Sequence, residues 1–338
     1  MTVQERTNRR RTVVRAGALG AALVATLGLT TGCGSSSASS ESNVKDLKVA
    51  VMNLAASAPY YVAQEKGYFK DAGLNVKLVS AAGAAEGVPP LVSGTIQVGS
   101  GNLITVMQAA EQGIQLTSIA TTNEAAPSLD DIGHKTSAVM VRPDSGIKSP
   151  KDLEGKTIAV NALNGLGDAT IKASLVKQGV DVDSLKFTEL TFPDMLTAID
   201  AKRVDAIWEV EPFVMAGKKA GLKPISYNFE EAALRLPLGV SFVTKQFADK
   251  NPETIKKFKQ AMDRAIDYLN EDEQRIRDAG VSVAKISPEV AAKMALPDMT
   301  TSFSRESVQS LADLSKEYGL LKKDPDLDAQ FGLVLEDK

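Results

Sequence analysis

Cysteine and histidine are almost absent from this chain of 338 residues, which has one cysteine, Cys33, and one histidine, His134. One cysteine cannot form a disulfide within the chain, and one histidine cannot supply a site built from several imidazole ligands. The G-x-S-x-G, H-E-x-x-H and P-loop signatures of common enzymes are also missing. The sequence therefore argues against an enzyme, and we expect neither a metal site nor a cofactor.

The apolar run near the N-terminus is too short to cross a bilayer. Residues 16–29 form a run of about 14 mostly apolar residues, against roughly 20 needed for a spanning helix. Five arginines precede it: Arg6, Arg9, Arg10, Arg11 and Arg15. A basic segment, a short apolar run and small residues at its end are typical of an export signal. Sec and twin-arginine export both stay open.

The end of this segment, residues 29–33 (LTTGC), resembles the lipobox of bacterial lipoproteins. It departs from that motif at Thr30, where leucine is most common. The resemblance implies cleavage before Cys33 and acylation of its thiol. We therefore expect a lipoprotein signal peptide in residues 1–32 and a lipidated, serine-rich tether in residues 33–44. An ordinary secretory signal with an incidental cysteine is the alternative.

The charge of the remaining chain is mildly acidic. Residues 1–32 hold five arginines and one glutamate, so the part that follows has about seven more acidic than basic residues. A body of this charge without a basic cluster argues against nucleic acid as a partner. It also argues against electrostatic docking on anionic lipid, so we expect acyl chains to hold the protein at the membrane.

Short β-branched runs alternate with amphipathic segments over much of the chain, which predicts an α/β fold with a largely parallel sheet. The expected strands are residues 47–52, 74–79, 95–99, 115–120, 156–161, 186–190 and 204–208. The expected helices between them are residues 59–66, 103–112, 168–178 and 194–201, with a further helix start at Ser149-Pro150. Residues 92–99 and 200–207 form a weak internal repeat, which indicates either two lobes of similar build or chance similarity.

The last third of the chain is predicted to be helical. Helices should begin after Asn251, Ser287 and Ser304. Apolar residues follow one face of the first and third of these helices, and we expect both faces to pack in the core. The apolar positions are Ile255, Phe258, Met262, Ile266, Leu269, Val308, Leu311, Leu314 and Tyr318.

Glu209 and Glu211 stand two residues apart in an extended segment, W-E-V-E-P. Paired carboxylates can carry out acid/base chemistry, but no second type of catalytic group lies nearby in the sequence. We favour a milder interpretation, in which one glutamate lines a cleft and the other caps the helix after Pro212.

Five segments together resemble ABC-transporter substrate-binding proteins of the nitrate, sulfonate, taurine and thiamine-precursor group. They are residues 58–69 (APYYVAQEKGYF), 91–99 (LVSGTIQVG), 153–160 (LEGKTIAV), 203–207 (RVDAI) and 211–213 (EPF). The resemblance implies a two-lobed, type II periplasmic-binding-protein-like α/β fold with a hinge and a ligand cleft between the lobes. By this resemblance, lobe 1 comprises residues 45–138 and 236–338, lobe 2 comprises residues 139–235, and strands near 137–142 and 239–244 form the hinge.

Ligand contacts in such proteins come from loops that follow strands. The resemblance therefore implies ligand-binding roles for Ser57, Tyr60, Gly101, Asn102, Asn123, Asn164, Gly165, Phe192, Trp208 and Glu209, with Thr122 and Asp194 beside them. Because these loops contain no lysine or arginine, an anion would be held by helix N-termini and amide dipoles. Glu209 in the cleft would disfavour a bare anion such as nitrate.

The implied function is the capture of a small organosulfonate or taurine-like nutrient for an ABC importer. The implied partners are this small molecule, a permease with a cytoplasmic ATPase, and the membrane through the lipid anchor on its extracytoplasmic side. We expect a monomer. Alternatives are an aminopyrimidine thiamine precursor, nitrate or an aromatic carboxylate as the ligand. A pyrimidine-making enzyme of related fold and a surface adhesin are alternatives of other classes.

Overall fold

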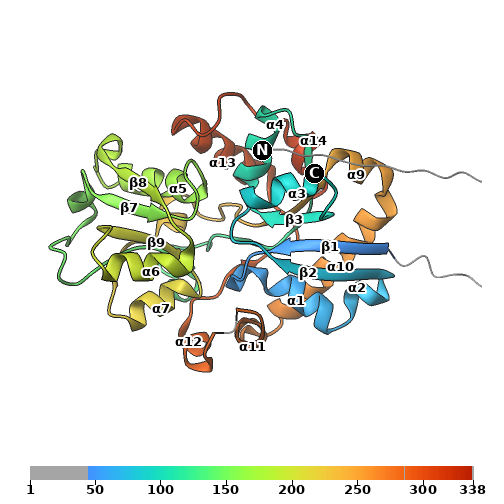
Figure 1. The fold of residues 1–338 in the computed structure, drawn as a ribbon, viewed down its shortest axis with the longest axis horizontal. Helices are drawn as coiled ribbons and strands as arrows, with labels where there is room; N and C mark the ends of the chain where they lie inside the picture. The colour runs from blue at the N-terminus through green and yellow to red at the C-terminus, as the bar shows by residue number, and fades with distance from the viewer. Residues whose placement is uncertain (1–44, 285, 337–338) are drawn as a thin grey trace, which may run out of the picture. The chain divides into compact units, whose positions relative to one another are not determined.

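The computed structural model describes residues 45–284 and 286–336 (Figure 1). All described residues belong to one compact unit, Ser42–Lys338. The predicted signal peptide, the lipobox with Cys33 and the tether lie outside the described residues. Within the described part of the chain, no helix has the length and apolar character that crossing a membrane requires.

The first sheet has five strands in the order β2-β1-β3-β11-β4. Its strands are β1 (Lys45–Val51), β2 (Leu74–Ser80), β3 (Val98–Gly101), β4 (Leu116–Thr121) and β11 (Val240–Thr244). Strand β1 is parallel to β2 and β3, whereas β11 is antiparallel to β3 and β4. The sheet therefore takes four strands from the first part of the described chain and one from a much later part.

The second sheet also has five strands, in the order β10-β6-β9-β7-β8. Its strands are β6 (Ser137–Val141), β7 (Thr157–Val160), β8 (Lys186–Glu189), β9 (Ala206–Val210) and β10 (Lys223–Ser226). Strand β7 is parallel to β8 and β9, and β6 is antiparallel to β9 and β10. A small third sheet pairs β5 (Asn123–Glu124) with β12 (Asp298–Met299).

Helices pack on both sides of the first sheet because its strands alternate their side chains between two cores (Figure 1). In β1, Leu47, Val49 and Val51 belong to one buried cluster, and Ala50 belongs to the other. The α-helices are α1 (Ala58–Glu65), α2 (Tyr68–Asp71), α3 (Val88–Val92), α4 (Leu103–Glu111), α5 (Leu166–Val176), α6 (Phe192–Asp200), α7 (Phe213–Lys219), α8 (Asn228–Ala232), α9 (Lys245–Lys250), α10 (Pro252–Asn270), α11 (Glu273–Ala284), α12 (Pro288–Lys293), α13 (Arg305–Glu317) and α14 (Leu327–Phe331). Five 3-10 helices are η1 (Ala55–Ser57), η2 (Ala85–Gly87), η3 (Ile132–His134), η4 (Pro150–Leu153) and η5 (Val182–Ser184).

The predicted apolar faces of the C-terminal helices are confirmed as core. Ile255, Phe258, Met262, Ile266 and Leu269 of α10 are all buried, and so are Val308 and Leu311 of α13. Leu314 and Tyr318 are partly buried against the same core. Ser287 and Ser304 cap α12 and α13 by accepting hydrogen bonds from Val290 N and Ser307 N, as expected of helix N-caps.

The predicted strands are confirmed in outline, and two local predictions need correction. The strand expected at residues 95–99 begins later, at Val98, because Gly94 and the residues after it form the turn that ends α3. The helix expected from Ser149 is only the single turn η4, in which Ser149 and Asp152 form a capping box. The antiparallel edge strand β10 and helix α11 were not predicted.

The lobe boundaries at 138/139 and 235/236 stay predictions. The first and third sheets draw their strands from residues 45–124, 240–244 and 298–299, and the second from residues 137–226. The two strands that we proposed as a hinge, β6 and β11, each lie inside a sheet. The chain passes between the two large sheets in the segments just before these strands, and the hinge itself stays a prediction.

Candidate functional site

A cavity of about 100 Å³ lies where strand ends and helix starts from the two large sheets meet. The first sheet contributes the ends of β1, β3 and β4, and the second contributes the ends of β7 and β9. The lining residues are Met52, Leu54, Ala55, Ala56, Ser57, Tyr60, Ser100, Gly101, Asn102, Thr122, Asn123, Thr136, Asn161, Leu166, Phe192, Trp208, Val210, Glu211, Phe229, Leu238, Gly239, Val240 and Pro297. We call this cavity the central pocket.

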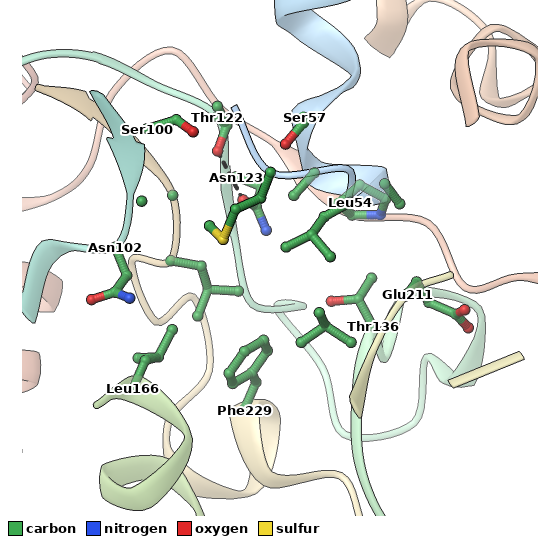
Figure 2. A pocket seen from close by; sticks show the side chains of 18 of the residues that line it. Leu54, Ser57, Ser100, Asn102, Thr122, Asn123, Thr136, Leu166, Glu211 and Phe229 are labelled. Atoms are coloured by element: carbon green, nitrogen blue, oxygen red, sulfur yellow. Dashed lines mark hydrogen bonds between the residues drawn. The ribbon is translucent and has the colours of Figure 1, made fainter. Parts of the chain in front are cut away.

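Two carboxamides on the side of the first sheet have fixed orientations (Figure 2). Asn102 caps α4, with its Oδ1 accepting a hydrogen bond of 3.1 Å from Thr105 N. The Oδ1 of Asn123 accepts a hydrogen bond of 3.0 Å from Thr122 Oγ1. Because both oxygens are engaged, each Nδ2 group is directed toward the interior of the pocket in Figure 2. These two residues can therefore offer N–H donors to a ligand.

The side of the second sheet is mostly apolar. Phe192, Trp208 and Phe229 line the pocket, with ring centroids 5.6 Å apart for Phe192 and Trp208 and 6.0 Å apart for Trp208 and Phe229. Leu166 and Val210 extend the same wall. Aromatic and aliphatic side chains without free polar groups favour the apolar part of a ligand.

A buried hydrogen-bond network fixes Trp208. Its Nε1 donates to Ser137 Oγ at 2.7 Å and to Asn228 Oδ1 at 3.1 Å, and Asn228 Nδ2 donates to Thr170 Oγ1 at 2.6 Å. The indole also packs directly on Gly167 of α5, where an added Cβ would lie 2.6 Å from Trp208 Cε3. The indole N–H is therefore already occupied, and the ring presents carbon atoms to the pocket.

Tyr60 lies in the lining but is fully buried. Its hydroxyl lies 2.7 Å from Ser241 Oγ, and burial raises its pKa well above the usual value, so the phenol stays neutral. Gly239, also in the lining, allows the close approach of Thr122, because a Cβ at that position would lie 1.9 Å from Thr122 Oγ1. These residues therefore shape the floor of the pocket.

The two glutamates of the W-E-V-E-P segment have different places. Glu211 lines the pocket, but its Oε1 accepts a hydrogen bond of 3.0 Å from Ala295 N and its Oε2 accepts one of 3.0 Å from Met215 N. The second bond caps the start of α7, and Figure 2 shows the carboxylate directed away from the centre of the pocket. Burial raises the pKa of Glu211 to about 7.

Glu209 is not part of the lining. It is fully buried in the central strand β9, and neither carboxyl oxygen has a hydrogen-bond partner among the described residues. This burial raises its pKa to about 9, which keeps the carboxyl protonated at neutral pH. Glu209 therefore brings no negative charge toward a ligand in the pocket.

The electrostatic character of the pocket comes from backbone dipoles. Helices α1, α4, α5 and α6 each begin at or beside a lining residue, namely Ser57, Asn102, Leu166 and Phe192. Helix N-termini carry partial positive charge and free N–H groups. Among the described residues, no lysine, arginine or histidine lines the pocket. The arrangement suits a ligand with hydrogen-bond acceptors or a single negative charge at one end and apolar atoms at the other.

The structure brings most of the predicted site residues together. Ser57, Tyr60, Gly101, Asn102, Asn123, Phe192 and Trp208 line the pocket, and so does Thr122. Asn164, Gly165, Glu209 and Asp194 do not. Sequence reasoning missed Thr136, Asn161, Phe229 and Leu238, among others. Asn161 ends the predicted strand 156–161, and this position at a strand end could have indicated it as a candidate. Phe229 belongs to a short helix that nothing in the sequence indicated.

Residues 55–276 match the family model described as NMT1/THI5 like. The chain belongs to this family. It is 27% identical over 263 residues to a putative aliphatic sulfonates-binding protein of Bacillus subtilis (strain 168), covering 74% of this chain and 73% of that protein. It is also 27% identical over 226 residues to the taurine-binding periplasmic protein of Escherichia coli (strain K12), covering 66% and 67% of the two chains.

Solved structures show the same fold. The alkanesulfonate-binding protein SsuA from Xanthomonas axonopodis pv. citri, bound to MOPS, superposes with a TM-score of 0.70 at 19% identity, covering 83% of this chain and 95% of that one. This likeness confirms the predicted periplasmic-binding-protein fold. Because these two curated relatives are binding proteins, they support a solute-binding role for this chain and not a catalytic one.

Proposed function

We propose that this protein is the extracytoplasmic solute receptor of an ABC importer and that its solute is a small organosulfonate. One observation carries the choice of solute: the central pocket places uncharged donors and the N-termini of α1 and α4 opposite an apolar wall. The three oxygens of a sulfonate share one negative charge and accept several hydrogen bonds, and its alkyl group needs an apolar surface. Each half of the pocket therefore matches one half of this molecule.

The anionic head would bind near Asn102 and Asn123. Their Nδ2 groups, the hydroxyl of Ser57 and the start of α4 all lie on the first-sheet side of the pocket. Donors that are already oriented need little reorganisation to stabilise an anion, because their dipoles point toward it before binding. The absence of a cation from the lining is compatible with a single negative charge held by several neutral donors.

The apolar wall favours an alkanesulfonate over nitrate, because nitrate has no apolar part to bury. The two glutamates also favour an alkanesulfonate over taurine, because the ammonium group of taurine needs a hydrogen-bond acceptor and neither glutamate offers a free one. Both oxygens of Glu211 are engaged by backbone N–H groups, and Glu209 is neutral and outside the lining. An aminopyrimidine would stack well on Phe192 and Phe229 but would leave its amino group without a free carboxylate acceptor.

Delivery to the permease would follow from closure of the two lobes, residues 45–138 with 236–338 and residues 139–235, around the solute. A solute that contacts both lobes favours the closed state, and only that state presents one continuous docking surface. Acylation of Cys33 would keep the monomeric receptor beside its permease, and the tether of residues 33–44 would allow it to reorient.

The test is a titration of the purified protein with a panel of solutes, followed by thermal shift and by calorimetry. The panel holds methanesulfonate, ethanesulfonate, butanesulfonate, taurine, nitrate, benzoate and an aminopyrimidine. We expect the melting temperature to rise with the alkanesulfonates and to change little with nitrate, because ligands that bind the native state stabilise it by mass action. Stabilisation by the aminopyrimidine and none by the sulfonates would contradict the proposed solute and support the thiamine-precursor alternative.

A further inference from the structure

The start of the first sheet carries lysines that have no acidic partner. Lys48 of β1 and Lys77 of β2 are register partners in a parallel strand pair, so their Cβ atoms lie side by side, and both side chains are exposed. Neither side chain forms an ion pair or hydrogen bond with another described residue. Like charges opposite each other on a sheet are destabilising. The fold therefore bears a local cost for keeping two cations together.

These lysines line a surface groove of about 610 Å³, together with Lys45, Asp46, Leu47, Asn75, Gln97 and Phe247. Lys45 is held there by a hydrogen bond of 3.0 Å to Asn251 Oδ1 and lies over the ring of Phe247. We call Lys45, Lys48 and Lys77 the basic end.

The acidic residues nearby offset only part of the positive charge of the basic end. Asp46 is the one carboxylate in the groove, and it accepts a hydrogen bond of 2.7 Å from Asn75 Nδ2. Asp71, on the neighbouring helix α2, pairs with Arg264 at 3.5 Å. A local excess of positive charge remains, although the chain after residue 32 is acidic as a whole.

The basic end lies where the folded unit joins the preceding segment of the chain, because β1 begins at Lys45. Acylation of Cys33 would leave only residues 34–44 between a membrane and this groove. The central pocket lies at the other end of the same strand, since Met52 and Leu54 line it. Along β1, Met52 lies about 23 Å from Lys45 and about 13 Å from Lys48.

Contrary to the expectation that we drew from the net charge, this placement leads us to propose that the basic end docks on the anionic phospholipid surface of the membrane. Each lysine close to such a surface strengthens binding by about fivefold, and a short tether raises the local concentration of the surface. A lipid anchor combined with a basic patch binds a membrane more firmly than the anchor alone. Docking through the start of β1 leaves the pocket at its far end open to solutes. The inference rests on the membrane anchoring in the proposed function, but its test does not use the anchor.

The test uses the compact unit Ser42–Lys338, which contains both sheets and the pocket but lacks Cys33. Its sedimentation with phosphatidylcholine vesicles is compared with that on vesicles containing about a third phosphatidylglycerol. We expect binding only to the anionic vesicles, a loss of at least about tenfold in the partition coefficient for K48E/K77E, and release in 1 M salt, where the Debye length is about 3 Å.

The control variant is K186E/K223E, which makes the same charge change at exposed lysines of β8 and β10 in the second sheet. The proposal would be overturned if K48E/K77E bound the anionic vesicles as well as the parent, or if the control variant lost as much vesicle binding as K48E/K77E. It would also be overturned if soluble glycerol phosphate displaced the protein from the vesicles at matched ionic strength, which would indicate a small-anion site instead. Stabilisation by ethanesulfonate is measured on the same samples. If ethanesulfonate still raises the melting temperature but the protein does not bind the vesicles, only this inference is contradicted. If the melting temperature does not rise, only the proposed solute is contradicted.

Discussion

Gln108 donates a hydrogen bond of 2.8 Å from its Nε2 to the carbonyl oxygen of Asn164. Gln108 lies on α4 beside the first sheet, and Asn164 lies in the loop between β7 and α5 of the second. Asn164 has a left-handed backbone with φ of 54°, and its N–H donates to Asp168 Oδ2 at 2.7 Å. The bond thus connects the two halves of the site beside the lining residues Asn161 and Leu166.

Removal of this bond should weaken solute binding. We expect Gln108→Ala to raise the Kd for the solute by about threefold to tenfold, because a hydrogen bond of this kind contributes about 0.5–1.5 kcal/mol to the conformation that holds both halves together. Calorimetry with the stabilising solute measures the change. Gln112→Ala, at an exposed position at the end of the same helix, is the control. Equal affinities in the two variants would show that the bond does not contribute to closure.

Asn123 should be the most sensitive donor of the pocket. Replacing its carboxamide with a carboxylate in Asn123→Asp removes the Nδ2 donor and places an acceptor, charged when ionised, where we expect the sulfonate. We therefore predict a loss of at least about tenfold in affinity, since a hydrogen bond to a charged group contributes about 1.5–3 kcal/mol. Gln246→Glu makes the same chemical change at an exposed site on α9 and should bind normally. An Asn123→Asp protein that still binds sulfonates tightly would place the anion elsewhere.

Gly167 should be needed for the position of the Trp208 ring. A Cβ at residue 167 would lie 2.6 Å from Trp208 Cε3, so Gly167→Ala must push the indole away from α5 or strain its hydrogen bonds. Overpacking of this kind costs about 1–3 kcal/mol of stability, and the displaced ring should also narrow the pocket. Gly87→Ala, where a Cβ would meet nothing within 4 Å, is the control. Thermal unfolding and sulfonate titration of both variants measure the two effects.

The weak internal repeat shows how far local sequence determines structure. Gly94 and Lys202, at the same place in residues 92–99 and 200–207, both have positive φ, 75° and 56°. Gln97 then pairs with Lys48, donating from its backbone N and accepting at its Oε1, and Asp205 pairs in the same way with Thr157. The two segments fold alike because the same helix end, turn and side-chain acceptor recur. Short-range patterns of this kind could be predicted.

The exact lining of the pocket could not be predicted in the same way. The sequence placed candidates in the loops after the strands, which is where the pocket lies, but a loop position does not determine the direction of a side chain. Asn161 lines the pocket, whereas Asn164 has a left-handed backbone and a carbonyl bonded to Gln108. Phe229 enters from α8, a helix of five residues that makes its contacts far away in the sequence. Such contacts depend on the packing of the two sheets.

Glu209 should make stability depend on pH in a direction opposite to that of a salt-bridged carboxylate. Its pKa is raised to about 9 in the folded protein, whereas an unfolded glutamate titrates near 4.3. Between these two values the folded state holds a proton that the unfolded state lacks, so the free energy of unfolding must fall as the pH rises, by at most about 1.4 kcal/mol per pH unit.

Glu209→Gln removes this ionisation while keeping the shape of the side chain. We therefore expect its stability relative to the parent to increase steadily from pH 5 to pH 9 in denaturant titrations. Glu306→Gln, at an exposed position at the start of α13, should follow the parent at every pH. Parallel curves for Glu209→Gln and the parent would show that Glu209 reaches water or a cation in solution, and that the carboxyl is not held neutral in β9.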